Sequence, residues 1–459
     1  MIKQYILILA FLISVNSMSQ NKKIFFGFAD VPQSLLINPG TEVDAQWHTG
    51  IPLLSGIYGH AGFTGFNLGD VFLNDGIDVN TKLNAVLANL NNKDFYTANQ
   101  QLEVFNIGLR LPNKKDYISF GFYQEFDGIV YHPKELVNLA QQGNQDFTQT
   151  FNLNDLKFKM ELLGVYHFGI TRKLSDKMTI GSRAKLYSSV YNMKSTKNTG
   201  ILVSRLGDDN IYNSRLQGVD FVVNTSGIAH DGHSVAEKNA KIGHFLGSGN
   251  MGFGLDFGLT YHINDKFVIS GSFEDLGFIR HTRQTTTYAI KGTQEFEGLN
   301  LIFPTTGTID YLNEVKNELP LVEGSKKYTS LRPLKLHGSL AYQFGKTKDN
   351  SCLRTNYKDS HKNEIGLQLY SVFRPRRPQG AATVYYYRKF AKFLKAKMTY
   401  TVDEYSYSNV GLGLSTHIGM FNMYGSVDNL LGVSNISKTN NQTLNFGMNI
   451  IMDYNTSKP

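Results

Sequence analysis

The last stretch of the sequence, residues 443–454, alternates large apolar residues with polar or small ones. The apolar positions are Leu444, Phe446, Met448, Ile450, Met452 and Tyr454, and only Ile451 breaks the rule. A period of two residues predicts a β-strand whose two faces meet different surroundings. The pattern lasts for about eleven residues, which is the length that a tilted strand needs to cross a bilayer. The sequence therefore predicts a transmembrane β-barrel that this strand closes.

Similar alternation recurs along the chain in pairs of segments joined by tight turns. The clearest case is residues 251–263, in which every second residue from Met251 to Ile263 is large and apolar. Further strands are predicted at 56–67, 105–111, 118–122, 156–171, 178–191, 267–278, 333–344, 364–374, 381–388, 394–402, 408–418 and 421–428. The total is about fourteen, an even number as in bacterial barrels. Short links alternate with long ones, which predicts tight periplasmic turns and long external loops.

The N-terminus resembles a cleaved export signal. Lys3 precedes an apolar run from Tyr5 to Val15, and small residues lead to a predicted cleavage site at Gln20. Residues 20–55 contain Pro32, Pro39 and Pro52, which are incompatible with a central strand. We therefore predict a signal peptide at 1–19, a periplasmic or plug segment at 20–55 and the barrel at 56–459.

Composition excludes several classes of protein. Cys352 is the only cysteine, so internal disulfides and multi-thiolate zinc sites are excluded. The net charge is +8, but the basic residues are scattered among strands and turns, and export argues against nucleic acid as a partner. We expect no cofactor and no metal. The motif HDGHS at 230–234 is interpreted as a polar external loop rather than a metal site.

Enzymatic chemistry is also disfavoured. His262 and His337 fall on predicted lumen faces near Ser270, Ser272 and Ser339, but no nucleophile elbow is present. The spaced glycines at 252–258 precede a strand rather than a helix, so they are no dinucleotide fingerprint. A short helix is predicted at 133–143 in an external loop, where it packs loops together or constricts the mouth.

Ten titratable residues have the parity of lumen-facing positions. They are Arg110, Arg183, Lys185, Asp256, His262, Glu274, Lys335, His337, Lys395 and Lys397. Such charges either pair with one another and help to close the lumen or line a pore that favours anions. Structural pairing is the preferred interpretation.

Three stretches resemble a known family: residues 32–40 (PQSLLINPG), 133–144 (PKELVNLAQQGN) and 252–280. They are similar to the DUF5723-type outer-membrane barrels of Bacteroidota, which resemble PorP/SprF and FadL-like barrels. The resemblance implies a plug segment around Asn38 and Pro39 that is tucked towards the lumen. Relatives of the PorP/SprF type are associated with type IX secretion and gliding, and FadL-like relatives carry hydrophobic molecules inward.

We therefore expect a monomeric, non-enzymatic barrel in the outer membrane, surrounded by lipid. The first functional hypothesis is a structural or accessory component of a surface or secretion machine, with other proteins of that machine as partners. The alternative is a FadL-like channel for small hydrophobic or anionic solutes. A channel requires a continuous route and a defined pocket, and a scaffold requires neither.

Overall fold

The computed structural model describes residues 23–131, 134–135, 150–205, 213–227, 243–296, 321–346, 361–391, 393–430, 432 and 439–453. Its helices are η1 (Lys23–Phe25), η2 (Pro32–Leu36), α2 (Leu68–Phe72), α3 (Val79–Asn89) and the π-helical turn η4 (His244–Ser248). None of them is long and apolar enough to cross a membrane. The strands are β1 (Ala45–Gly50), β2 (Ile57–Phe63), β3 (Phe95–Arg110), β4 (Asp116–Tyr131), β5 (Thr150–Asn152), β6 (Lys157–Lys173), β7 (Met178–Arg205), β8 (Asn213–Gly227), β9 (Asn250–His262), β10 (Phe267–His281), β11 (Thr285–Phe296), β12 (Val322–Gly324), β13 (Tyr328–Leu331), β14 (Lys335–Lys346), β15 (His361–Phe373), β16 (Pro378–Lys389), β17 (Leu394–Asp403), β18 (Asn409–Ile418), β19 (Phe421–Asp428) and β20 (Asn441–Asp453).

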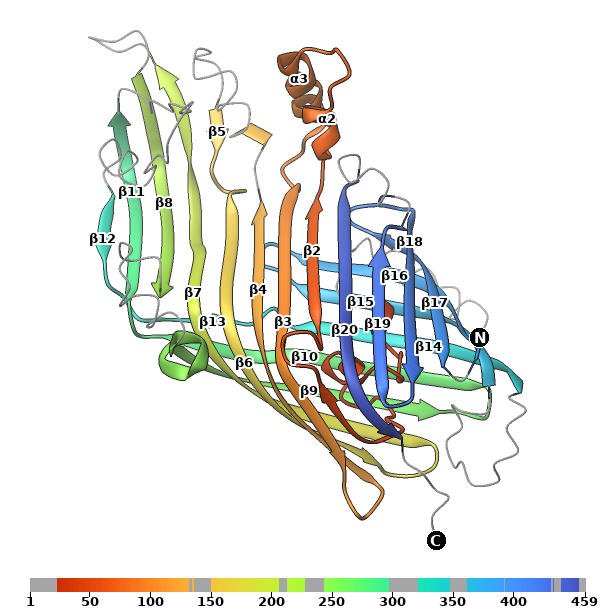
Figure 1. The fold of residues 1–459 in the computed structure, drawn as a ribbon. Coiled ribbons are helices and arrows are strands. Elements are labelled where there is room, and N and C mark those ends of the chain that lie inside the picture. The colour runs from red at the N-terminus through yellow and green to blue at the C-terminus, as the bar shows by residue number, and fades with distance from the viewer. Residues whose placement is uncertain are drawn as a thin grey trace, which may run out of the picture.

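The strands close into an antiparallel barrel with a wall of 14 strands (Figure 1). Two segments, β1 and β2, together make the first wall strand, because each pairs with β20 on one side and with β3 on the other. The predicted all-β barrel is confirmed, and β20 is the strand that closes it. Tight links such as 111–115, 174–177 and 263–266 lie at one end, called the turn end. Helices α2 and α3 lie at the other end, called the loop end, at the top of Figure 1.

The wall buries polar side chains inside and exposes large apolar side chains outside. On β9, Asp256 is 0% exposed whereas its neighbour Phe257 is 43% exposed. Comparable outward residues are Ile107, Phe120, Phe168, Leu186, Phe253, Phe273, Leu340, Leu367, Val384, Met398, Leu414, Met423 and Leu444. This arrangement is the reverse of a soluble protein and matches a wall that faces hydrocarbon.

One side of the barrel is taller than the other. Strand β7 has 28 residues, pairs with β9 up to Ser189, and from Tyr191 onward pairs with β8. Strand β8 pairs with β11, and β11 pairs with β12. We call these extensions at 191–205, 213–227, 285–296 and 322–324 the flange. The flange raises the wall at the loop end, on the left of Figure 1.

The wall begins at Ala45 rather than at Gly56, so the predicted boundary between the N-terminal segment and the barrel is shifted. Strand β1 alternates too weakly to be recognised from sequence. Pro52, which has no backbone N–H, and Leu53, with φ 64°, interrupt the first wall strand between β1 and β2.

Several sequence predictions fall outside the described residues. Of the predicted helix at 133–143, only Lys134 and Glu135 are described, and both are helical. The other predictions outside the described residues are the signal peptide at 1–19, the loop motif at 230–234, Cys352 and Tyr454.

Residues 23–44, called the plug, lie inside the barrel, where Figure 1 draws them in red among the wall strands. Phe25, Phe26 and Val31 are each at most 1% exposed. The plug contains η1 and η2, and Pro32 suits the first turn of η2. Sequence reasoning predicted a plug in this part of the chain.

Candidate functional site

A β-bulge in β10 turns two consecutive acidic side chains into the lumen. The pairing of β10 with β9 shifts register between Phe273 and Leu276, and Asp275 has φ 61°. Glu274 and Asp275 are both buried, whereas neighbours in a regular strand point to opposite faces. The backbone N–H of Asp275 donates to Asp256 Oδ1 over 2.7 Å. The bulge is thereby tied to β9.

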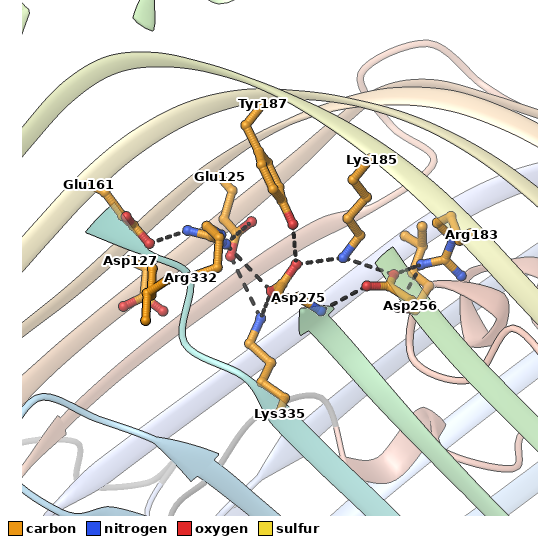
Figure 2. A network of polar contacts seen from close by, with 12 residues as sticks. Glu125, Asp127, Glu161, Arg183, Lys185, Tyr187, Asp256, Asp275, Arg332 and Lys335 are labelled. Atoms are coloured by element: carbon orange, nitrogen blue, oxygen red, sulfur yellow. Dashed lines mark hydrogen bonds and ion pairs between the residues drawn. The ribbon is translucent and has the colours of Figure 1, made fainter. Parts of the chain in front are cut away.

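Lys185 joins the two aspartates at the centre of a buried network (Figure 2). Its Nζ lies 2.6 Å from Asp275 Oδ1 and 2.9 Å from Asp256 Oδ2. Arg183 Nη1 donates to Asp256 Oδ2 over 3.0 Å. The Tyr187 hydroxyl donates to Asp275 Oδ1 over 3.1 Å. Each aspartate therefore has at least two donors.

The network continues from Asp275 across the lumen to β4 and β6. Lys335 Nζ lies 2.8 Å from Asp275 Oδ2 and 3.7 Å from Glu125 Oε1. Arg332 Nη2 donates to Glu125 Oε2 over 2.9 Å, and Arg332 Nη1 donates to Glu161. The charged groups therefore link walls that are distant along the sheet.

Lys159 pairs with Glu161 at the edge of the network, 3.3 Å away, and the centre of the network contains as many basic as acidic side chains. They are Arg183, Lys185, Arg332 and Lys335, with Glu125, Glu161, Asp256 and Asp275. A buried charge is tolerated when an opposite charge and hydrogen bonds accompany it. This balance favours paired charges that close the lumen over a pore that attracts anions.

Two predicted histidines form separate pairs. His337 Nε2 lies 2.7 Å from Glu274 Oε1, and the ring stacks on Phe26 of the plug with centroids 5.1 Å apart. His262 Nε2 lies 3.1 Å from the carboxylate of Glu42, which also belongs to the plug. Both predicted residues therefore contact the plug rather than an open pore.

Asp30 is the acidic residue through which the plug meets β16 and β17. Lys395 Nζ donates to Asp30 Oδ1, and the Tyr387 hydroxyl donates to Asp30 Oδ2 over 2.6 Å. Burial raises the pKa of Asp30, but the positive charges of Lys395 and Lys389 outweigh it, so the pKa lies well below its ordinary value of 3.8. The predicted residue Lys395 therefore holds the plug by an ion pair.

Donors on the wall bind carbonyl groups of the plug. Lys397 Nζ and Gln368 Nε2 donate to the Phe26 carbonyl over 2.8 and 3.0 Å. The other pairs are Arg183 with Leu36 (3.0 Å), Ser272 with Ile37 (2.7 Å), Thr171 with Pro39 (2.6 Å) and Arg110 with Val43. Side chains bond too, since Gln33 Nε2 donates to Glu103 and Asn449, each over 2.9 Å. The wall thus satisfies six carbonyl groups or side chains of the plug, which is how buried polar groups are tolerated.

The predicted residues Asn38 and Pro39 lie against two paired glycines on β7 and β9. A Cβ at Gly181 would lie 1.9 Å from the Pro39 carbonyl oxygen, and a Cβ at Gly258 would lie 2.0 Å from Asn38 Oδ1. The Gly40 N–H donates to Asn38 Oδ1 over 2.9 Å and fixes the turn. Glycine is required at both wall positions because the plug backbone approaches so closely.

An aromatic cluster fills the space between the plug and the opposite wall. Phe25 packs edge-on against Tyr424 at 5.1 Å, and Phe28 packs edge-on against Tyr387 at 5.3 Å. The cluster comprises Phe25, Phe26, Phe28, Val31, Ile37, Val268, Ala341, Tyr385, Tyr387 and Tyr424. Burial of this apolar surface stabilises the docked plug.

The cavities that described residues line around the plug are small. One of about 30 Å³ lies between Leu36, Tyr58, Tyr123 and the network residues Lys185 and Lys335. Three others in the described part of the chain measure about 10 to 20 Å³. Spaces of this size hold a few water molecules and are too small for an organic solute.

Three arginines of one turn, 374–377, cover the loop end of the lumen. Arg374 donates to the buried carboxylate of Asp127 on β4. Arg376 donates to Asp155 and to the carbonyl of Asn92, in the links before β6 and β3. Arg377 Nη2 lies 2.7 Å from Glu404. The turn thus ties together parts of the mouth that lie far apart in sequence.

The described serines and histidines that the sequence singled out do not form a Ser-His-carboxylate arrangement. Ser270 bonds to Ser339 over 2.7 Å, and Ser272 donates to the plug. His281 contacts Ser226 over 2.7 Å and Ser330 over 2.8 Å, so its two ring nitrogens face hydroxyls and no carboxylate orients it. All three residues are at most 1% exposed. Among the described residues, no group of three or more His, Cys, Asp or Glu is placed to hold a metal ion.

Sequence reasoning missed part of the network. Glu125 continues the inward parity of β4, as does Asp127, which pairs with Arg374 outside the network, so the alternation could have identified both. Asp275 lies on the bulge, and its signal was the pair of consecutive acidic residues within an apolar strand. Arg332 lies between β13 and β14, where no alternation predicts its direction.

Comparison with family models supplies the classification. Residues 39–428 match the model described as "Family of unknown function (DUF5723)". The chain belongs to the DUF5723 family. No curated protein matches this DUF5723 chain.

Solved structures that are similar to this DUF5723 chain include two toluene transporters and a FadL homologue. The Ralstonia pickettii toluene transporter TbuX is 10% identical, with 93% of this chain and 94% of that chain covered and a TM-score of 0.44. A Pseudomonas aeruginosa FadL homologue is 9% identical, with 95% and 99% covered and a TM-score of 0.44. The Pseudomonas putida toluene transporter TodX is 11% identical, with 92% and 94% covered and a TM-score of 0.41. Two of these proteins are described as toluene transporters and one as a FadL homologue.

Proposed function

We propose that this chain is a closed, non-enzymatic barrel of the outer membrane that serves as a structural or accessory component of a cell-surface assembly. The observation that carries the proposal is the filled lumen, in which wall donors bind the plug carbonyls and the charges pair with one another. Conduction requires a continuous route, whereas a scaffold requires a stable wall and an external surface. The flange and helices α2 and α3 provide such a surface at the loop end.

The sequence resemblance suggests which assembly this is. PorP/SprF-like barrels of Bacteroidota are associated with type IX secretion and gliding, so components of such a machine are the proposed partners. In this proposal the chain is exported through its N-terminal signal and acts as one barrel in contact with outer-membrane lipid.

A second candidate function is a plug-gated channel for small hydrophobic solutes. The observation in its favour is the aromatic wall behind the plug, formed by Tyr385, Tyr387 and Tyr424. Withdrawal of Phe25 and Phe28 would leave an apolar pocket of the kind that binds such solutes. This function requires the plug to move, and the first one does not.

A disulfide between plug and wall separates the two functions. An ideal Cβ at Gly413 lies 2.4 Å from Ile24 Cγ2. Since Cγ2 is one bond from the Ile24 Cβ, the two Cβ atoms lie within about 4 Å, as a disulfide requires. Ile24→Cys with Gly413→Cys, in a Cys352→Ser background, should therefore lock the plug. Each single cysteine variant is the matched control.

The locked and reduced barrels are then compared in planar bilayers and in native membranes. The scaffold function predicts no conductance in either state and the same cross-linked partners, including secretion components, with the plug locked. Conductance or uptake of a monoaromatic solute that appears only on reduction would contradict it and support the channel. Absence of secretion components from the cross-linked material would contradict the proposed assembly.

A further inference from the structure

Arg280 faces outward at the loop end of β10, beside an otherwise uncharged surface. The bulge at Asp275 reverses the parity of β10, so that Ile279 and His281 are buried while Phe278 and Arg280 are exposed. The outward residues of β9 and β10 are Met251, Phe253, Leu255, Phe257, Leu259, Tyr261, Phe267, Ile269, Gly271, Phe273, Leu276, Phe278 and Arg280. Arg280 is the one charged residue in this set.

The position of Arg280 along the strand determines its surroundings. It is the last outward residue of β10, about twelve residues from the turn end, which is beyond the length that spans the hydrocarbon. A lipid-facing arginine is costly at mid-membrane but is tolerated where headgroups begin. No carboxylate of a described residue pairs with Arg280. Its counter-charge is therefore expected from outside the described chain.

Arg283 reaches the same outer side of the wall. Its Nη1 donates to the Ser248 carbonyl of η4 over 2.8 Å, and its backbone N–H donates to Asn250 Oδ1 over 2.9 Å. Turn η4 itself packs on the outer face of β6, because a Cβ at outward-facing Gly164 would lie 2.2 Å from the Phe245 carbonyl oxygen. The guanidinium of Arg283 is thus fixed outside the barrel, with donors left to bind an anion.

Apolar side chains surround the two arginines on the side towards the turn end. Leu331 of β13, opposite Phe278, is 74% exposed, and Leu246 of η4 is 57% exposed. Arg280 and Arg283 are three residues apart, one at the end of β10 and the other in the bend that follows it, so that one phosphorylated headgroup can meet both. A soluble anion would contact only the arginines, whereas a lipid would contact the arginines with its phosphate and the apolar surface with its acyl chains.

We propose that Arg280 and Arg283 bind the phosphate of an anionic lipid in the outer leaflet, with its acyl chains against Phe278, Leu331 and Leu246. The site lies on the outside of the barrel and does not depend on whether the plug moves. The outer face of β9, β10 and η4 would bind one class of ligand, a lipid that carries a phosphate group.

The test uses the full-length barrel in neutral detergent, titrated with a bisphosphorylated lipid A and observed by native mass spectrometry. Arg280→Gln with Arg283→Gln should lower the apparent affinity about tenfold or more, because two charge-assisted contacts are lost. Arg388→Gln is the matched control, since Arg388 is also exposed on the wall but lies at the turn end, over Phe390. It should bind lipid A like the wild type.

Four outcomes would overturn the proposal. The double variant could retain lipid A as the wild type does. Arg388→Gln could lose as much lipid, which would indicate non-specific attraction. Finally, millimolar inorganic phosphate could displace the lipid, or dephosphorylated lipid A could bind equally well, which would indicate a free-anion site or an apolar site respectively. Unchanged heat-dependent migration of each variant on gels verifies that the barrel is folded.

Discussion

Lys185 Nζ lies 2.6 Å from Asp275 Oδ1, although the two residues are 90 positions apart in the sequence. Asp275 also forms ion pairs with Lys335 and Arg332. Removal of its charge therefore leaves several buried cations without a full set of opposite charges. Asp275→Asn should lower the free energy of unfolding by about 3 to 5 kcal/mol. The single tryptophan, Trp47, provides the fluorescence signal for denaturant unfolding in detergent.

The matched control for this prediction is Asp220→Asn on the flange, where the side chains of Lys197 and Asp220 are 60% and 34% exposed. Its unfolding free energy should equal that of the wild type within error. If Asp275→Asn were no more destabilising than Asp220→Asn, the network would contribute nothing to stability.

The close contact between Gly181 and the plug predicts that one added methyl group at this position weakens plug docking. Gly181→Ala would place a Cβ against the Pro39 carbonyl, and overpacking of this kind costs about 1 to 3 kcal/mol. The docked plug should therefore open about tenfold or more often. Thiol labelling of Ser34→Cys, a buried plug position, in a Cys352→Ser background measures this opening.

The control for the glycine substitution is Gly338→Ala on β14, where a Cβ has no neighbour within 4 Å. It should label at the wild-type rate. Equal labelling rates of the Gly181 and Gly338 variants would show that plug docking does not depend on the absence of a side chain at Gly181.

Two arginines of the turn at 374–377 should differ in their contribution to stability. The Arg374–Asp127 pair is at most 4% exposed, whereas the Arg377 side chain is 37% exposed. Arg374→Gln should cost about 3 to 5 kcal/mol and Arg377→Gln about 0 to 1 kcal/mol. Denaturant midpoints of the two variants measure the difference. Equal midpoints would contradict the conclusion that the buried Arg374–Asp127 ion pair stabilises the barrel.

The lowered pKa of Asp30 predicts how plug docking depends on pH. The folded pKa lies below 3.8, so the contribution of the carboxylate is fully present above that pH and is lost as the pH falls through the folded pKa. The difference in plug protection between wild type and Asp30→Asn should be constant from about pH 5 to 8 and should vanish in stronger acid. Hydrogen exchange measures it, and a change between pH 5 and 7 would exclude Asp30 as the cause.

Alternation in the sequence was sufficient to predict the barrel, because one face meets lipid and the other meets a polar lumen. Residues 251–263 and 443–453 illustrate this, since a one-residue slip would reverse every side chain. The same parity predicts that Arg183, Lys185 and Asp256 face the lumen, and all three side chains are buried in the structure. Their pairing was a preference, and the structure supplies the distances that support it.

The bulge at Asp275 and strand β1 could not be predicted from the alternation of apolar and polar residues. The bulge at Asp275 moves one residue inward and all later residues of β10 to the opposite face, so Arg280 faces lipid. Local propensity cannot specify such a shift, because it depends on the Asp256 side chain that accepts the Asp275 N–H. Strand β1 was missed for a similar reason, since only its pairing with β20 and β3 identifies it.

The bond from Gln33 to Asn449 spans 416 positions and sets an order of events during biogenesis. The plug is among the first parts of the chain to be synthesised, yet its partners include the last strand. It can dock only after the sheet has closed. Until then, the phenylalanines of the plug lack the wall contacts that bury them and expose apolar surface. The docked plug therefore marks a sheet in which β20 is in place.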